Sequence, residues 1–105
     1  MTTKVYNKLV RDRIPEIIQA EGKTYRTENI SGPDLLVALK KKLVEEVAEF
    51  EEDNDVKELA DILEVVYALS EVLGCEEGKL NALRKSKTES NGGFEKGIFL
   101  LEAEI

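Results

Sequence analysis

The chain has 105 residues, of which 42% are hydrophobic and 35% charged, and its net charge is −7. This length favours one domain with a modest core, and the acidic balance disfavours binding to a nucleic-acid polymer, whose phosphates would repel it. The sequence has no His and one Cys, Cys75, which excludes a Ser-His-Asp triad, His metal ligands and an intrachain disulfide. Any metal would be held mainly by oxygen, which favours hard ions such as Mg²⁺ or Mn²⁺.

The sequence shows no sign of a membrane segment or of a second domain. No apolar run approaches the roughly 18 residues that span a bilayer, and residues 1–10 lack the apolar stretch of a signal peptide. We therefore expect a cytoplasmic protein without a membrane partner. Because no repeat or long linker divides the chain, we expect a single domain over residues 1–105.

The first half of the chain predicts one short and one long helix. Residues 14–22 suit a short helix with Pro15 in its first turn, and residues 23–31 are β-like or irregular. A long helix is expected over 31–53, because apolar residues recur at positions 36, 39, 43, 47 and 50.

The second half predicts a helical hairpin followed by a weaker helix. Residues 53–55 suit a tight turn, and a second long helix is expected from Val56 to Leu73, closed by Gly74. A further helix covers about 77–88, residues 90–93 break it, and residues 94–105 suit an extended tail or a short strand. The fold class we predict is all-α, an antiparallel helical hairpin in a helical bundle, with possible short β-like segments at the ends.

Four acidic residues point toward the apolar faces of the two long helices. At 100° per residue, Glu46 falls within the apolar stripe of its helix and Glu49 lies at the edge, whereas Glu45 is better placed for solvent. On the second helix Glu58 points along the stripe and Asp61 lies on its flank. A turn centred on residues 53 and 54 would set Glu49 opposite Glu58 and Glu46 opposite Asp61.

Carboxylates that converge in this way repel one another unless they are protonated or bind a cation. The pattern therefore predicts a site for a divalent metal ion. Other interpretations stay open. Asp55 and Glu58 have the spacing of a capping box, and Glu46 could pair with Lys42 four residues earlier. The remaining acids suit a solvated helix surface.

The motifs around these acids resemble a known superfamily. "EEVAEF" followed by "ELADILEVVYAL" is similar to the E-x-x-E … E-x-x-D signature of the MazG-like all-α nucleoside triphosphate pyrophosphohydrolases. The opening "YNKLVRDRIPEII" and the closing "GGFEKGIFLLE" resemble a small single-domain subgroup described as phosphoribosyl-ATP pyrophosphohydrolase-like. The likeness extends over most of the chain.

The resemblance implies hydrolysis of a nucleotide between its α and β phosphates, giving a monophosphate and pyrophosphate. It also implies Mg²⁺, for which Mn²⁺ can substitute, carried by Glu46, Glu49, Glu58 and Asp61. Glu45 is a plausible auxiliary that supports the ligands or orients water. Without a His, a carboxylate or a metal-activated water must supply the nucleophile.

Basic side chains near both ends are candidates for contacts with the leaving pyrophosphate, although Lys and Arg on an acidic protein also simply balance surface charge. Relatives with this ending often read K-x-x-x-R-G-G-F, whereas this chain has Lys87 and then Asn91 in place of the Arg. The candidate residues are Lys8, Arg11, Arg13, Arg84, Lys85 and Lys87.

The second long helix is apolar nearly all round, which predicts a subunit interface and hence a homodimer or a dimer of dimers. An intrachain core closed by the first long helix and the tail is the alternative. For function, the resemblance favours nucleotide-pool house-cleaning. The alternatives are phosphoribosyl-ATP hydrolysis in histidine synthesis and a non-catalytic nucleotide-binding module. A di-iron helical bundle is disfavoured because such sites normally use His.

Overall fold

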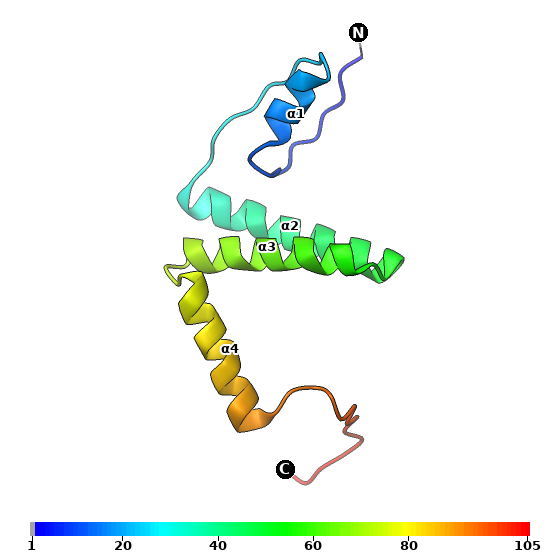
Figure 1. The fold of residues 1–105 in the computed structure, drawn as a ribbon, viewed down its shortest axis with the longest axis vertical. Coiled ribbons are helices and arrows are strands. Elements are labelled where there is room, and N and C mark those ends of the chain that lie inside the picture. Colours follow the sequence, from blue (N-terminus) through cyan, green and yellow to red (C-terminus); the bar gives the residue numbers. More distant parts are fainter. Residues whose placement is uncertain (1) are drawn as a thin grey trace.

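The computed structural model describes residues 2–105, and all of its regular secondary structure is helical. The helices are α1 (Ile14–Ala20), α2 (Gly32–Asp53), α3 (Val56–Val72) and α4 (Glu77–Asn91) (Figure 1). Residues 2–105 contain no strand, and the segments outside the helices are irregular. The expectation of an all-α chain is therefore confirmed, whereas the β-like segments considered for the ends are not formed.

Helix α2 begins and ends where the sequence predicts. Ser31 precedes it with an extended backbone (φ −151°, ψ 172°), and a proline follows in the first turn. The helix ends at Asp53 because Asn54 turns into the left-handed region (φ 53°, ψ 29°), where its N–H donates to the Phe50 carbonyl at 2.8 Å. Asn is one of the few residues that adopt this conformation at modest cost.

Helix α3 starts directly after this turn and packs antiparallel to α2. The Asp55 carboxylate accepts a hydrogen bond from the Lys57 N–H at 2.9 Å, which satisfies one of the free donors of the first turn. The two-residue connection folds α3 back along α2, with Leu39 and Val65 buried between the helices at 4% and 8% exposure. No other apolar side chain among residues 2–105 is buried to the same degree.

The two outer helices differ slightly from their expected limits. Helix α1 ends at Ala20, two residues before the expected Gly22. Helix α4 continues to Asn91 instead of about Thr88, and within its last turns the Ser90 hydroxyl donates to the Ser86 carbonyl at 3.1 Å. The break falls at Gly92, whose φ of 85° suits glycine.

The chain has an open outline. Helix α4 leaves the end of the hairpin and contacts only α3 among the described helices, while α1 packs against none of them. Along its three principal axes the chain measures 62 × 32 × 25 Å. The helical bundle thus stays a prediction, since the helices of one chain do not close it. Within residues 2–105, no helix combines the length and the apolar character needed to cross a membrane.

Candidate metal centre

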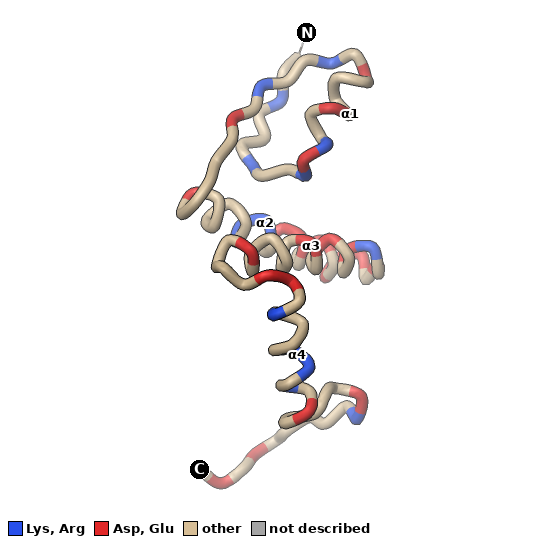
Figure 2. The backbone as a smooth tube through the Cα atoms, turned by 60° about the vertical axis from the view of Figure 1, so that its left-hand side comes forward, with Lys and Arg blue, Asp and Glu red and all other residues tan. Residues whose placement is uncertain are grey.

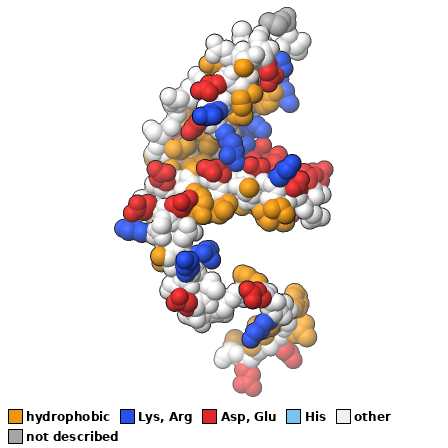
Figure 3. Space-filling model, in the orientation of Figure 1, with side chains coloured by type: hydrophobic (Ala, Val, Ile, Leu, Met, Phe, Trp, Pro, Cys, Tyr) orange, Lys and Arg blue, Asp and Glu red, His pale blue; other side chains and the backbone are white. Residues whose placement is uncertain are grey.

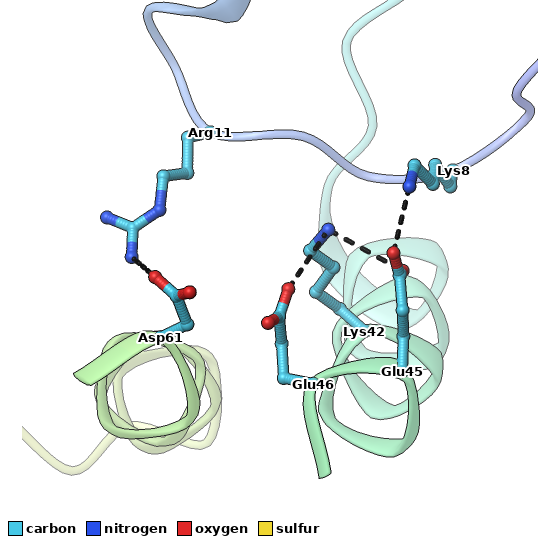
Figure 4. Close-up of polar contacts among 6 residues, drawn as sticks. All are labelled: Lys8, Arg11, Lys42, Glu45, Glu46 and Asp61. Atoms are coloured by element: carbon cyan, nitrogen blue, oxygen red, sulfur yellow. Dashed lines mark hydrogen bonds and ion pairs between the residues drawn. The ribbon is translucent and has the colours of Figure 1, made fainter. Parts of the chain in front are cut away.

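Three carboxylates from the two helices of the hairpin meet at their shared seam. Glu46 comes from α2, and Glu58 and Asp61 come from α3. One oxygen from each lies within 4.8 Å of the others. The Glu46 and Asp61 side chains extend from neighbouring helices on the same side, toward the segment that carries Lys8 and Arg11 (Figure 4). The tight turn at Asn54 and Asp55 produces this register, so residues twelve to fifteen positions apart share one site.

Glu46 is buried and Glu58 is half-buried, and each has one buried oxygen without a partner among the described residues. Glu46 is only 7% exposed. Its Oε2 atom, like Oε2 of Glu58, is buried without a hydrogen-bond partner among residues 2–105. A buried carboxylate oxygen without a donor costs free energy that a protein rarely leaves uncompensated. Because this Glu58 oxygen has no backbone partner, it does not cap its own helix, which weakens the capping-box interpretation.

The protonation behaviour of Glu46 agrees with this environment. Burial raises the pKa of Glu46 above its ordinary value, and the nearby negative charge of Glu49 raises the pKa further. Lys42 acts in the opposite direction from 3.4 Å, so the pairing of Glu46 with Lys42 considered from the sequence is present. That lysine contacts Oε1 of Glu46 and leaves Oε2 free to accept a proton or a cation.

Glu49 lies at the edge of the cluster rather than within it. Its side chain is exposed, and its oxygens do not belong to the three that come within 4.8 Å of one another. Its charge nevertheless raises the pKa of both Glu46 and Lys8. The structure therefore brings three of the four expected carboxylates together and leaves the fourth beside them.

Glu45 is held in place, not free in solvent as the helical pattern suggests. Its Oε1 accepts a hydrogen bond from Lys8 at 2.8 Å, and its Oε2 lies 3.5 Å from Lys42. The hydrogen bond from Lys8 lowers the pKa of Glu45 despite partial burial, and the same bond raises the pKa of Lys8. The helical wheel missed this because Lys8 comes from outside the hairpin.

The segment before α1 crosses both helices of the hairpin, and a basic side chain of this segment contacts each helix. Lys8 pairs with Glu45 on α2, and Arg11 donates to Oδ1 of Asp61 on α3 at 2.7 Å (Figure 4). Two of the basic residues predicted near the N-terminus therefore border the carboxylate cluster. Arg13 is exposed and directly precedes α1.

The basic residues predicted on the fourth helix lie elsewhere in the chain. Helix α4 points away from the hairpin and contacts only α3 among the described helices (Figure 2). Asn91, which stands where relatives often have Arg, is the last residue of α4. The structure of one chain does not bring this helix to the carboxylates, and its three candidate residues, Arg84, Lys85 and Lys87, are all exposed.

A pocket next to the cluster contains basic residues that the sequence analysis did not select. It lies between residues 7–9 and the face of α2 that carries Lys41, Lys42 and Glu45. Lys42 and Glu45 connect the pocket to the carboxylate cluster, because Lys42 also contacts Glu46. The run of three lysines at 40–42, one turn before the acids, is the sequence signal that could have indicated it.

The donor set fits a hard divalent cation. Octahedral ligands of Mg²⁺ at about 2.1 Å from the ion lie roughly 3 to 4.2 Å apart, close to the separation of up to 4.8 Å among Glu46, Glu58 and Asp61. The buried and unpartnered oxygens supply the charge that such an ion needs. A site of this kind leaves further coordination positions for water or for phosphate oxygens.

Comparison with known proteins gives one partial relative. A protein of Mycolicibacterium smegmatis (strain ATCC 700084 / mc(2)155), itself uncharacterised, is 52% identical over 42 residues, or 40% of this chain. The match spans 43% of the length of that relative. No protein-family model and no solved structure match the chain. The comparisons therefore assign no family, and the evidence for function rests on the residues of the site.

Proposed function

We propose that this chain is a Mg²⁺-dependent nucleotide pyrophosphohydrolase of the MazG-like, phosphoribosyl-ATP pyrophosphohydrolase-like type. Its reaction would be hydrolysis of a nucleoside triphosphate between the α and β phosphates in nucleotide-pool house-cleaning. The observation that carries the proposal is the convergence of Glu46, Glu58 and Asp61, two of them with buried oxygens that lack partners. The resemblance of the acidic motifs to that superfamily supports the reaction type.

In this proposal the carboxylates hold the metal and the surrounding lysines meet the phosphates. Glu46, Glu58 and Asp61 would bind Mg²⁺, and Glu49 would join them after a side-chain rotation, since it already acts on Glu46 electrostatically. The bound ion would neutralise phosphate charge and make a water molecule more acidic. Lys41 and Lys42 line the adjacent pocket and suit the β and γ phosphates.

Glu45 is the residue best placed to act on water. Its pKa is lowered by Lys8, so it is ionised at neutral pH and can accept a hydrogen bond. Its two lysine contacts fix the carboxylate beside the cluster. We propose that Glu45 orients the attacking water, while Glu46 next to it in the chain binds metal.

The test is pyrophosphate release from a panel of nucleotides in the presence of Mg²⁺, including dUTP, dCTP, oxidised nucleotides and phosphoribosyl-ATP. We expect turnover of at least one triphosphate, dependence on the metal, and loss of turnover in Asp61→Asn. Nucleotide binding without pyrophosphate release would instead indicate a non-catalytic module. Turnover confined to phosphoribosyl-ATP would assign the histidine-synthesis reaction, which complementation of a histidine auxotroph would then check.

A further inference from the structure

The pocket beside the carboxylate cluster extends past the lysines that suit the phosphates. It has a volume of about 230 Å³ and lies between residues 7–9 and the face of α2 that starts at Asp34. Pockets that enclose a whole drug-sized ligand have roughly 300–1,000 Å³, so this one suits a single ring of a larger ligand. In Figure 3, hydrophobic and basic side chains lie next to one another where the N-terminal part of the chain meets the hairpin.

The residues of α2 that line the pocket change in character along the helix. Those that recur every three or four positions, and so share one helical face, are Asp34, Ala38, Lys41 and Glu45. Lys41 lies about 6 Å before Glu45 along the helix axis, and Asp34 lies about 10.5 Å before Lys41. The pocket therefore runs from the carboxylate cluster, past the lysines, toward the first turn of α2.

Between the lysines and Asp34 the wall of the pocket is aliphatic. Leu9 of the N-terminal segment and Val37 and Ala38 of α2 line this part. Val37 is 52% exposed, so a bound group would cover apolar surface that the chain itself leaves open. A phosphate group gains neither a hydrogen bond nor an ion pair from an aliphatic wall. The carbon face of a sugar or a base, by contrast, would pack against it.

The far end of the pocket carries two hydrogen-bonding side chains. An ionised Asp34 accepts hydrogen bonds, and the amide of Asn7 both donates and accepts them. Both residues are exposed, so their polar atoms are accessible to a ligand. Asp34 also repels a terminal phosphate that reaches toward it, because both groups are negative. An acid in the first turn suits the dipole of α2 as well, so the experiment must separate the two roles.

We propose that this pocket holds a hydroxylated ring attached to the far end of the phosphate chain, so that the preferred substrate is a capped nucleotide. Two sources share this chemistry, a nucleoside diphosphate sugar and a dinucleoside polyphosphate. The inference rests on the proposed hydrolysis between the α and β phosphates and names the substrates that this reaction prefers. The lysines bind the phosphates, the ring packs on Val37 and Ala38, and Asp34 accepts hydrogen bonds from its hydroxyl groups.

The bonds that form and break are the same for a capped nucleotide. The oxygen of a water molecule bonds to the α phosphorus, and the bond from that phosphorus to the oxygen that bridges it to the β phosphorus breaks. The bridging oxygen leaves with the β phosphate. A nucleoside diphosphate sugar thus gives a nucleoside monophosphate and a sugar phosphate, and the protons of the water pass to the solvent.

The first experiment compares capped and uncapped nucleotides that share a base, in the presence of Mg²⁺. UDP-glucose is compared with UTP, and diadenosine tetraphosphate with ATP. We expect kcat/KM to be about 10-fold higher for one capped nucleotide than for its free triphosphate. Preference for UDP-glucose would assign the sugar nucleotides, and preference for diadenosine tetraphosphate would assign the dinucleoside polyphosphates.

Asp34→Asn keeps the shape of the side chain and removes its charge. We expect the preference for the capped nucleotide to fall about 10-fold, because free triphosphates are no longer repelled and the hydroxyl groups lose an ionised acceptor. Glu77→Gln is the matched control and should leave the preference unchanged, because Glu77 is an acid in the first turn of α4 and does not line this pocket. An equal fall in both variants would contradict the proposal.

The second experiment needs neither metal nor turnover. Glucose 1-phosphate, AMP and inorganic phosphate are each titrated into the full chain while its methyl resonances are followed by NMR. We expect a ring-bearing phosphate to shift the methyl signals of Val37 and Ala38, and inorganic phosphate to leave them in place. Ala82 of α4, which does not line the pocket, provides a reference methyl group that should not shift.

Two results would overturn the proposal: free triphosphates that turn over as well as the capped nucleotides, or unshifted signals of Val37 and Ala38 with every ring-bearing phosphate. Either result would leave the proposed hydrolysis of triphosphates intact if UTP or ATP is hydrolysed. Shifted signals without turnover of any nucleotide would instead support the ring pocket and refute the proposed hydrolysis. The two failures are therefore distinguishable.

Discussion

Arg11 donates a 2.7 Å hydrogen bond to Asp61, the same carboxylate that meets Glu46 and Glu58 across the hairpin seam. The guanidinium of Arg11 and a divalent cation would compete for the negative charge of this carboxylate. In the metal-free chain, Arg11 of the N-terminal segment neutralises part of the negative charge of the cluster. Metal binding must therefore compete with the contact between Arg11 and Asp61.

Removal of Arg11 should therefore tighten metal binding. The ion pair is half exposed, at 56% for Arg11 and 39% for Asp61, so solvent screening limits its contribution to about 1 kcal/mol. We expect Arg11→Gln to bind Mn²⁺ up to about fivefold more tightly, measured by electron paramagnetic resonance. Arg26→Gln removes the same charge from the exposed segment before α2 and should have a much smaller effect. Equal changes in the two variants would show that only net charge matters.

Neighbouring acids on α2 should respond in opposite directions to neutralisation. Burial raises the pKa of Glu46, so the fold disfavours its charge, and Glu46→Gln should stabilise the metal-free chain at pH 7. Lys8 lowers the pKa of Glu45, so Glu45→Gln should destabilise the chain by a few tenths of a kcal/mol. Chemical denaturation of both variants measures the two signs. A large loss of stability in Glu46→Gln would identify Glu46 as a structural ion-pair partner of Lys42.

The pH dependence of these two differences follows from the direction of each pKa shift. The pKa of Glu46 is raised, so the cost of its charge is absent below the ordinary value of 4.5 and grows as the pH rises through the raised value. The advantage of Glu46→Gln should therefore appear with rising pH. The pKa of Glu45 is lowered, so its stabilising contribution is present above 4.5 and is lost as the pH falls through the lowered value. Unfolding curves between acidic and neutral pH check both trends.

Neutralising Asp61 or Glu49 tests the two parts of the metal centre, the three converging oxygens and the carboxylate beside them. Asp61→Asn removes one of the three converging oxygens and should abolish turnover and weaken Mn²⁺ binding at least 10-fold. Glu49→Gln should also abolish turnover, because the charge of Glu49 acts on Glu46 and its carboxylate would join the ligands, while helicity and melting temperature without metal stay nearly unchanged. Full activity in Glu49→Gln would restrict the centre to three carboxylates.

Local pattern was sufficient to predict the hairpin and the seam. Apolar spacing placed α2 and α3, and Asn54 and Asp55 supplied the turn and the cap that set their register. Helical angles then placed Glu46 inside the seam, where it is 7% exposed. The same reasoning could not place Glu45, because its environment is made by Lys8, 37 residues earlier in the chain. Contacts from segments without periodicity carry no such signal, whereas the run of lysines at 40–42 was a sequence signal for the pocket beside Lys41 and Lys42.

The turn itself offers the last test, because the site depends on the register that it sets. Asn54 adopts φ 53°, a conformation that costs Ala about 1 kcal/mol more than Gly. We expect Asn54→Gly to keep the stability and metal affinity of the wild type, and Asn54→Ala to lose about 1 kcal/mol of stability. Strain that shifts α3 along α2 would also weaken Mn²⁺ binding, whereas strain confined to the turn would leave it unchanged. Denaturation and Mn²⁺ titration of the two variants together therefore measure how closely the carboxylate cluster is coupled to a single left-handed residue.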